Sequence, residues 1–217
     1  MNKALLLNKS YPHFVEAKLA EQLTPENRAE FYEKPLREFL ESNSFGTVTG
    51  GGTLLTPRMF PGEMGIEFVN LDVQLSDLDE ALTALRAKLV DLGAPVGSML
   101  AYEDGDQQVE SLGNLELLNV FIDNTLDRSF FEAIGFDDLL AKLNGRLEKS
   151  NAGKLRSVCQ WPRETLIYFG GADADSMYET IKTLTDEVLV LQNARITFQR
   201  KDPIRQPIEI RVPFKKN

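Results

Sequence analysis

The sequence predicts an α+β fold made of two tandem ferredoxin-like repeats, each with the order β-α-β-β-α-β and an antiparallel sheet. Two helical segments are the first reason, because their apolar residues recur at the same spacings with a constant offset of 99 residues. Their flanks are the second, because both helices follow two strand-like segments and precede a third. The 217 residues are 42% hydrophobic and 26% charged, which suits one large or two small globular domains.

The two equivalent helices are predicted over residues 77–93 and 174–188. Each has one apolar face at helical spacing. In the first helix, Ser76 is the expected N-cap and Gly93 the expected end. The repeated apolar residues are Leu78, Leu82, Leu85 and Leu89 in the first helix, and Met177, Ile181, Leu184 and Val188 in the second.

The rest of the first repeat follows from helix-start residues and apolar alternation. Residues 25–42 are predicted to form a helix, with Thr24 as N-cap and Pro25 in its first turn. Pro35 is expected to kink or split this helix, because proline lacks an N–H group and clashes with the preceding turn. The predicted strands are 3–7, 46–55, 65–75 and 98–103.

The second repeat has a predicted helix over residues 136–150, and its predicted strands are 115–123, 154–161, 164–171 and 194–200. A polar, glycine-bearing stretch at 104–114 is typical of a linker. We therefore expect the first repeat at 1–104 and the second at 115–200. An extended basic tail follows at 201–217, and its strand-like part, 208–214, is expected to add to a sheet edge or reach a neighbouring subunit.

The chain is acidic, with 24 Lys and Arg against 33 Asp and Glu, a net charge of −9 and a pI of about 4.8. Acidity disfavours nucleic acid, where phosphate contacts dominate affinity, and it disfavours anionic membrane surfaces. It is compatible with a basic protein partner and also with simple solubility. Residues 200–217 carry six basic and two acidic side chains, so this segment is +4 and the remainder is −13.

The cysteine content and the lengths of the apolar runs indicate the cellular compartment. The single cysteine, Cys159, excludes an internal disulfide and a cysteine-cluster metal site. The start, MNKALLLNKS, has too short an apolar run for a secretory signal, and no apolar stretch approaches the length of a membrane span. We therefore expect a cytoplasmic protein of a bacterial type.

The stretch GTVTGGGTLL at residues 46–55 contains three consecutive glycines, Gly50, Gly51 and Gly52. A phosphate-binding loop needs a helix N-terminus after the glycines, and the Walker pattern also needs Lys followed by Ser or Thr. Here TLLTPRMFPG follows, with two prolines and no Lys. The run therefore predicts a bulge or a close backbone approach in a strand. Contact with a ligand or with another chain is the alternative.

A second candidate binding site is RSVCQWPRET at residues 156–165, which brings together Arg156, Trp161, Arg163 and Glu164 near a predicted hairpin. Trp and Arg are enriched where proteins bind each other most tightly. The alternative is that the single Trp anchors the hairpin to the core. Single-stranded nucleic acid would need a row of stacking residues in a basic groove.

No residue pattern indicates catalysis, a metal or a cofactor. His13 is the sole histidine, and we expect it in a loop without further zinc ligands. Cys159 lies in a strand-like run typical of a buried thiol, and no nucleophile turn is present. Asp104 and Asp106 form part of a charged turn, because EF-hand spacing is missing. Asp72 belongs to a polar row expected on the solvated face of a strand.

Several short stretches resemble, in the same order, the pattern of an uncharacterised family of bacterial cytosolic proteins. Members of that family typically carry EVTGGGT, then GAPKGS, then W-x-G-x-x-E-T-A-L-Y-L-Y-G. This sequence departs from the pattern at Val96, where the family often has Lys, and at Pro162. The resemblance implies one folded two-repeat protein and brings no assigned activity. The stretches are EKPLREFLE at 33–41, VTGGGT at 48–53, LGAPVGS at 92–98 and ETLIYFGG at 164–171.

These patterns favour a non-enzymatic protein-binding module. A basic protein would suit the acidic charge of the chain as its partner. An immunity- or antitoxin-like role is one version of this function. A small-ligand sensor or an enzyme with a pocket between the two repeats is an alternative, based on fold analogy. A structural homodimer that uses the 208–214 strand is another. Neither nucleic acid nor a membrane is expected as a partner.

Overall fold

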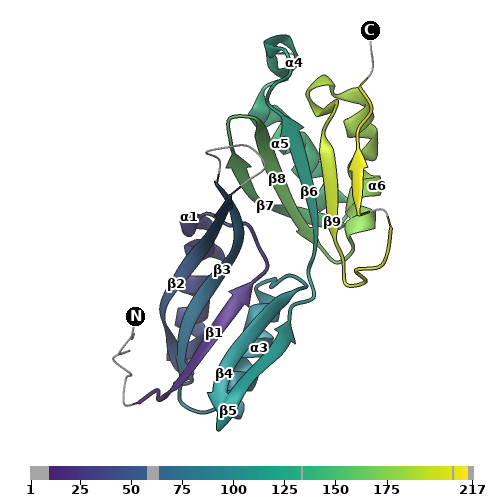
Figure 1. Cartoon of the computed structure of the whole chain (residues 1–217). Coiled ribbons are helices and arrows are strands. Elements are labelled where there is room, and N and C mark those ends of the chain that lie inside the picture. Colours follow the sequence, from purple (N-terminus) through teal and green to yellow (C-terminus); the bar gives the residue numbers. More distant parts are fainter. Residues whose placement is uncertain (1–9, 58–63, 133, 207, 215–217) are drawn as a thin grey trace. The chain divides into compact units, whose positions relative to one another are not determined.

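The computed structural model describes residues 10–57, 64–132, 134–206 and 208–214. The chain divides into two compact units, Met1–Asn114 (unit 1) and Leu115–Asn217 (unit 2), and each is described by itself. The fold is mixed α+β, and each unit has one five-stranded antiparallel sheet (Figure 1). None of the helices within the described residues is long and apolar enough to cross a membrane.

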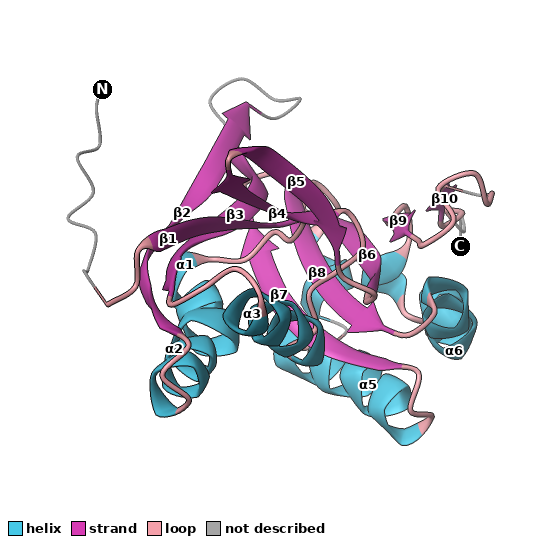
Figure 2. Cartoon of the chain, turned by 90° about the horizontal axis from the view of Figure 1, so that it is seen from below, coloured by secondary structure: helices cyan, strands magenta, loops and turns pink. Residues whose placement is uncertain are grey.

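In unit 1 the sheet order is β2-β3-β1-β4-β5. Figure 2 shows its helices gathered on one face of this sheet. Its elements are β1 (His13–Leu19), α1 (Pro25–Arg28), the π-helix η1 (Ala29–Glu33), α2 (Lys34–Ser42), β2 (Gly46–Pro57), β3 (Met64–Leu75), α3 (Glu80–Asp91), β4 (Ser98–Asp104) and β5 (Asp106–Leu112).

The first strand differs from the prediction. The strand expected at 3–7 lies outside the described residues, and β1 is formed by HFVEAKL. Its alternation explains why: Val15, Ala17 and Leu19 are fully buried toward the helices, whereas the residues between them face the other way. His13, expected in a loop, is the first residue of this strand.

The first helical segment begins as predicted. Thr24 is the N-cap, its Oγ1 accepts a hydrogen bond from the N–H of Asn27 at 3.3 Å, and Pro25 occupies the first turn. The segment is also divided, as Pro35 predicts, because the π-helical turn η1 ends where α2 begins and Pro35 lies in the first turn of α2. A π-helical turn accommodates the hydrogen bond that proline cannot donate.

The helix α3 begins three residues later than expected, and Ser76 is not its cap. The N-cap residue is Asp79, and the carboxylate of Asp77 satisfies the helix start, because its Oδ1 accepts from the N–H groups of Asp79 at 3.0 Å and Ala81 at 3.1 Å. These hydrogen bonds, first that from Ala81, lower the pKa of Asp77. The predicted end is confirmed, since Gly93 follows the helix with a φ of 89°.

The segment 104–114, expected to be a linker, contains the strand β5, so the unit expected at 1–104 extends further. Residues 106–112 pair with β4 without a register shift, and Gly105 with a φ of 71° makes the turn between the two strands. The segment is polar because β5 is an edge strand, where charged side chains are common. Glu110 of β5 pairs with Arg86 of α3 at 2.6 Å.

In unit 2 the sheet order is β10-β9-β6-β8-β7. The segment 201–217, expected as a tail after a second repeat at 115–200, belongs to this unit, and β10 pairs with β9 at the sheet edge. The elements are β6 (Glu116–Asp123), α4 (Arg128–Glu132), α5 (Phe136–Lys149), β7 (Gly153–Gln160), β8 (Glu164–Gly171), α6 (Ala174–Glu187), the 3-10 helix η2 (Leu189–Leu191), β9 (Arg195–Gln199) and β10 (Glu209–Arg211).

Each unit has its own apolar core between its helices and its sheet. The predicted leucine stripe of α3 lies in the first core, and Met177, Ile181 and Leu184 of α6 lie in the second. The two units differ in charge. Unit 1 has nine Lys and Arg against 18 Asp and Glu, whereas unit 2 has 15 against 15. The net charge of −9 therefore resides in unit 1.

Candidate functional site

The glycine run lies in β2, at the edge of the sheet of unit 1. The pairing of β2 with β3 shifts register between Val48 and Gly50, so the predicted bulge is present. After the bulge, Gly50, Gly51 and Gly52 pair with Asp72, Leu71 and Asn70. The run forms a strand and starts no helix, so it lacks the converging N–H groups of a phosphate loop.

Gly51 faces the helices and allows an ion pair to lie against the strand. A Cβ at this position would be 3.2 Å from Glu33 Oε1, 3.3 Å from Arg28 Nε and 2.7 Å from the carbonyl oxygen of Asn70. Arg28 Nε donates to Glu33 Oε1 at 2.6 Å, and its Nη1 donates to Thr53 Oγ1 at 2.9 Å. The glycine is therefore explained by close packing.

Gly50 and Gly52 point to the opposite face of the sheet, which the helices do not cover. We call this surface the helix-free face. Its residues form two cross-strand rows in the order β2-β3-β1-β4-β5. One row is Gly50, Asp72, Glu16, Ala101 and Val109, and the next is Gly52, Asn70, Lys18, Met99 and Ser111.

The helix-free face mixes apolar and acidic groups. Val109 is 60% exposed, and the two glycines leave the β2 ends of these two rows without side chains. In the middle, Glu16 and Asp72 are directly opposite each other on adjacent strands. Like charges in this position destabilise a sheet. Asn70 Nδ2 donates to Asp72 Oδ1 at 3.4 Å, and Lys18 Nζ lies 3.8 Å from the centre of the Phe68 ring.

The sequence predicted four further contact residues, all of which lie in unit 2. Arg156 is only 5% exposed, and it lies in β7 beside Gly170, at the register shift between Leu155 and Ser157. Arg163 is exposed in the turn between β7 and β8, which Trp161 begins.

Glu164 opens β8 and pairs with Arg195 of β9 at 3.3 Å. Asn124 holds the same turn, because its Nδ2 donates to the carbonyl oxygen of Trp161 at 2.8 Å and its N–H donates to that of Arg163 at 2.9 Å. The structure thus brings Trp161, Arg163 and Glu164 together at one hairpin. Gly50, Gly51 and Gly52 belong to the other unit, and the role of Asn124 has no sequence signature.

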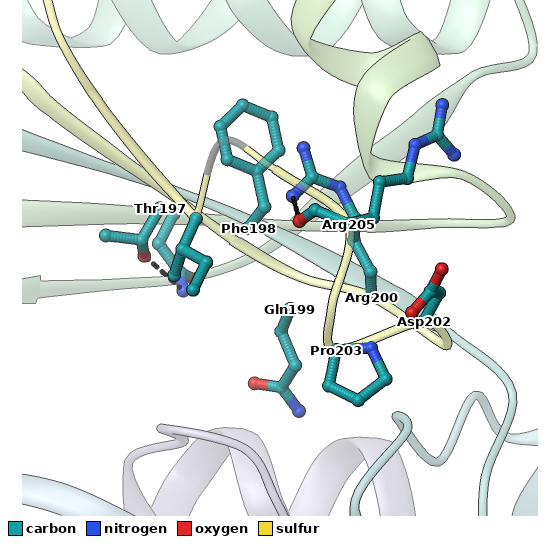
Figure 3. Close-up of a pocket in the computed structure, with 9 residues that line it drawn as sticks. Thr197, Phe198, Gln199, Arg200, Asp202, Pro203 and Arg205 are labelled. Atoms are coloured by element: carbon teal, nitrogen blue, oxygen red, sulfur yellow. Dashed lines mark hydrogen bonds between the residues drawn. The ribbon is translucent and has the colours of Figure 1, made fainter.

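Unit 2 contains a pocket of about 370 Å³ that sequence reasoning did not identify (Figure 3). Asn119 of β6 and Thr197 and Gln199 of β9 line one side of it, and the loop after β9 contributes Asp202 and Arg205. Asn119 is distant from the others in the sequence, 78 residues before Thr197. The pairing of β6 with β9 brings the two together.

The loop beside this pocket is fastened by ion pairs. Arg200 has a side chain only 3% exposed, and it binds Asp175 of α6 at two points, Nε to Oδ2 at 2.9 Å and Nη2 to Oδ1 at 2.6 Å. Arg205 Nε also approaches Asp175 Oδ2, at 3.2 Å. The hydrogen bond from Arg200 is the main cause that lowers the pKa of Asp175. Arg200 therefore holds the loop, and half-exposed Arg205 adds a weaker contact with Asp173 at 3.7 Å.

Buried Glu116 completes the fastening of the loop. Its Oε2 accepts from the N–H of Ala174, at the start of α6, at 2.8 Å, and its Oε1 accepts from the N–H of Lys201 at 3.0 Å. One carboxylate therefore joins β6 to both the helix and the loop. Within the described residues, no group of three or more His, Cys, Asp or Glu is arranged to hold a metal ion.

Comparison with known proteins leaves the site to be argued from its geometry. No protein-family model matches the chain, and no curated protein matches it. A solved structure described as the crystal structure of an unknown protein from Galdieria sulphuraria is 12% identical. The match covers 86% of this chain and 97% of that one, with a TM-score of 0.23.

Proposed function

We propose that the protein is a non-enzymatic protein-binding module, and that the helix-free face of unit 1 binds a basic partner. The observation that carries this proposal is the direct opposition of Glu16 and Asp72 on an exposed sheet face. Such a pair costs the isolated protein stability, and a cation of a partner that binds Glu16 would lower that cost.

The surroundings of the two carboxylates suit a protein surface. Exposed Val109 and its neighbours Ala101 and Met99 offer apolar contact area on one side. Gly50 and Gly52 on the other side let a partner backbone approach closely. Apolar contacts beside a few charged anchors are typical of protein interfaces.

The charge distribution supports the sign of the partner. Unit 1 carries the whole net charge of −9, so its field attracts a basic protein and repels an acidic one. Glu16 makes no hydrogen bond or ion pair with the part of the chain that the structure describes. Its carboxylate is therefore available to a lysine or arginine of a partner. An immunity- or antitoxin-like role is one version of this function.

We also propose that each unit is a ferredoxin-like βαββαβ module with one added edge strand. The order β4-β1-β3-β2 in unit 1 and the order β9-β6-β8-β7 in unit 2 support this assignment. The added strands are then β5 and β10. In this arrangement the helices occupy one face of each sheet and leave the other face for binding.

The test compares two charge reversals that change the net charge equally. Glu16→Lys alters the helix-free face, whereas Glu38→Lys alters an exposed position of α2 on the helix side. Tagged wild type and both variants are used to recover proteins from cells of the source organism, with quantitative mass spectrometry. A basic protein recovered with wild type and Glu38→Lys is then purified, and its affinity for all three chains is measured by calorimetry.

We expect Glu16→Lys to weaken binding by about tenfold or more, because it places a cation where the partner presents one. Glu38→Lys should bind nearly as wild type does. Equal losses of affinity in both variants would show that the partner is held only by non-specific charge attraction. A recovery pattern that does not change with Glu16→Lys would remove the helix-free face from the function. A dimer of this chain that dissociates in that variant would make the face a homodimer interface and would overturn the basic partner.

A further inference from the structure

The pocket of unit 2 contains a buried hydrogen-bond acceptor that no described residue satisfies. Asn119 lines the pocket, and its Oδ1 is buried without a hydrogen-bond partner among the residues that the structure describes. Its Nδ2 donates to Thr197 Oγ1 at 3.1 Å. Buried polar groups are nearly always paired, so an unpaired one beside a cavity requires an explanation.

The position of Asn119 makes this unpaired atom costly. On the same face of β6, Asn119 lies between Leu117 and Phe121, both of which are buried. An apolar residue at position 119 would fit that surrounding without the desolvation cost of an amide. The asparagine is therefore better explained by a molecule that enters the pocket and donates a hydrogen bond to Oδ1.

The groups around Asn119 define the chemistry of that molecule. Asn119 offers an acceptor and, on Nδ2, a second N–H beside the one that Thr197 receives. A side-chain amide with both groups available matches another amide, which has an N–H and a C=O side by side. If the nitrogen and oxygen of Asn119 are exchanged, the same match holds, because an amide edge pairs with either orientation.

The rest of the pocket is compatible with a small neutral molecule. Arg200 is neutralised by Asp175, and Arg205 approaches both Asp175 and Asp173. Both arginines are therefore paired with carboxylates, and the lining carboxylate of Asp202 accepts a hydrogen bond from the N–H of Ile204 at 3.0 Å. The volume of about 370 Å³ also limits the ligand to a small molecule or a short molecular end.

We propose that the pocket formed by Asn119, Thr197 and the 200–206 loop binds small neutral molecules through a primary-amide or urea-type group. This site is independent of the partner surface on unit 1. Its ligand donates an N–H to Asn119 Oδ1 and accepts from Nδ2 or from the hydroxyl of Thr197.

The experiment uses two probes of similar size that differ in one property. Acetamide has N–H donors and a carbonyl, whereas N,N-dimethylacetamide keeps the carbonyl and lacks the donors. Each is titrated to tens of millimolar into the full-length ¹⁵N-labelled chain, and chemical shifts are followed by NMR. Wild type, Asn119→Leu and Thr197→Val are compared, with Glu148→Ala as a control at an exposed position of α5.

We expect acetamide to shift the backbone signals of residues 119, 197 and 199–206 and the side-chain amide of Asn119, with saturation in the millimolar range. The dimethylated probe should give less than a third of that shift. The response should vanish in Asn119→Leu, weaken in Thr197→Val, and persist in the Glu148 variant. Equal shifts from both probes, retained shifts in Asn119→Leu, or no response to acetamide would each overturn the proposal.

Discussion

Arg200 and Asp175 form a two-point ion pair that fastens the end of β9 to the first turn of α6, with nitrogen–oxygen distances of 2.9 and 2.6 Å. The guanidinium group is almost fully buried, so removal of the carboxylate takes the negative charge away from a cation that keeps its hydrogen bond to the carbonyl oxygen of Arg205 and its contact with the Phe198 ring. This pair shapes the loop of the amide-binding pocket, and it has a consequence for stability that depends on pH.

Asp175→Asn should destabilise unit 2 by about 2 kcal/mol at neutral pH, because charged hydrogen bonds to a buried arginine are lost. Trp161 is the single tryptophan and lies in unit 2, so its fluorescence reports urea unfolding of that unit. Glu179→Gln, which breaks an exposed pair with Lys182 on the same helix, is the control and should change the stability little.

The same pair predicts a pH dependence with a defined sign. Arg200 lowers the pKa of Asp175 in the folded protein below its ordinary value of 3.8. A lowered pKa contributes stability that is present above the unfolded pKa and is lost as pH falls through the folded pKa. The difference between wild type and Asp175→Asn should therefore be full at pH 6 and should shrink below pH 4. A difference that stays constant down to pH 2 would contradict this assignment.

Gly51→Ala should destabilise the protein by about 1–3 kcal/mol, because the added methyl group would meet the Asn70 carbonyl and the Arg28–Glu33 ion pair. Gly145→Ala is the matched change at a position where a Cβ meets nothing, in the exposed part of α5. It should stabilise by about 0.5–1 kcal/mol. Circular dichroism during urea unfolding measures both. If Gly51→Ala is as stable as wild type, the helical segment does not pack closely against the glycine.

Gly105 tests the hairpin that replaces the predicted linker. Its φ is 71°, and a Cβ there would meet no atom within 4 Å, so the cost of Gly105→Ala comes from the backbone conformation alone. We expect a loss of about 1 kcal/mol. Gly105→Asn should cost less, because asparagine tolerates this conformation. If both variants unfold as wild type does, the left-handed turn between β4 and β5 is not formed.

Glu16 should limit the stability of unit 1. Glu16→Gln removes its repulsion with Asp72 and should stabilise the protein by roughly 0.5 kcal/mol. The gain should shrink in 1 M salt, which screens exposed charges. The same variant should bind the proposed basic partner more weakly. Urea unfolding at two salt concentrations checks the first result, and a loss of stability at low salt would show that Glu16 has a favourable contact.

Local patterns predicted most of the helices and strands. Thr24 and Pro25 begin the first helical segment and Pro35 lies where it divides, as predicted. The leucine stripe of α3 is buried, as its spacing indicates. The errors arose where composition misled. The strand β1 at 13–19 was not predicted, the strand expected at 3–7 lies outside the described residues, and the polar edge strand β5 was taken for a linker.

The candidate sites were harder to predict, because they depend on pairing between distant residues. Glu16 and Asp72 oppose each other only in the register of β1 and β3. Asn119 meets Thr197 across 78 residues of sequence, and nothing local marks either as a pocket residue. The glycine run was visible in the sequence, but the ion pair that makes Gly51 necessary comes from the preceding helical segment.

The concentration of net charge in unit 1 has a kinetic consequence. A protein whose two halves carry −9 and zero has an uneven long-range field, so encounters with a cationic molecule are oriented before contact. At physiological ionic strength this field decays over about 8 Å, and at tenfold lower salt over about three times that distance. Association rates should therefore rise steeply on dilution of salt, while dissociation rates, set by short-range contacts on the helix-free face, should change little.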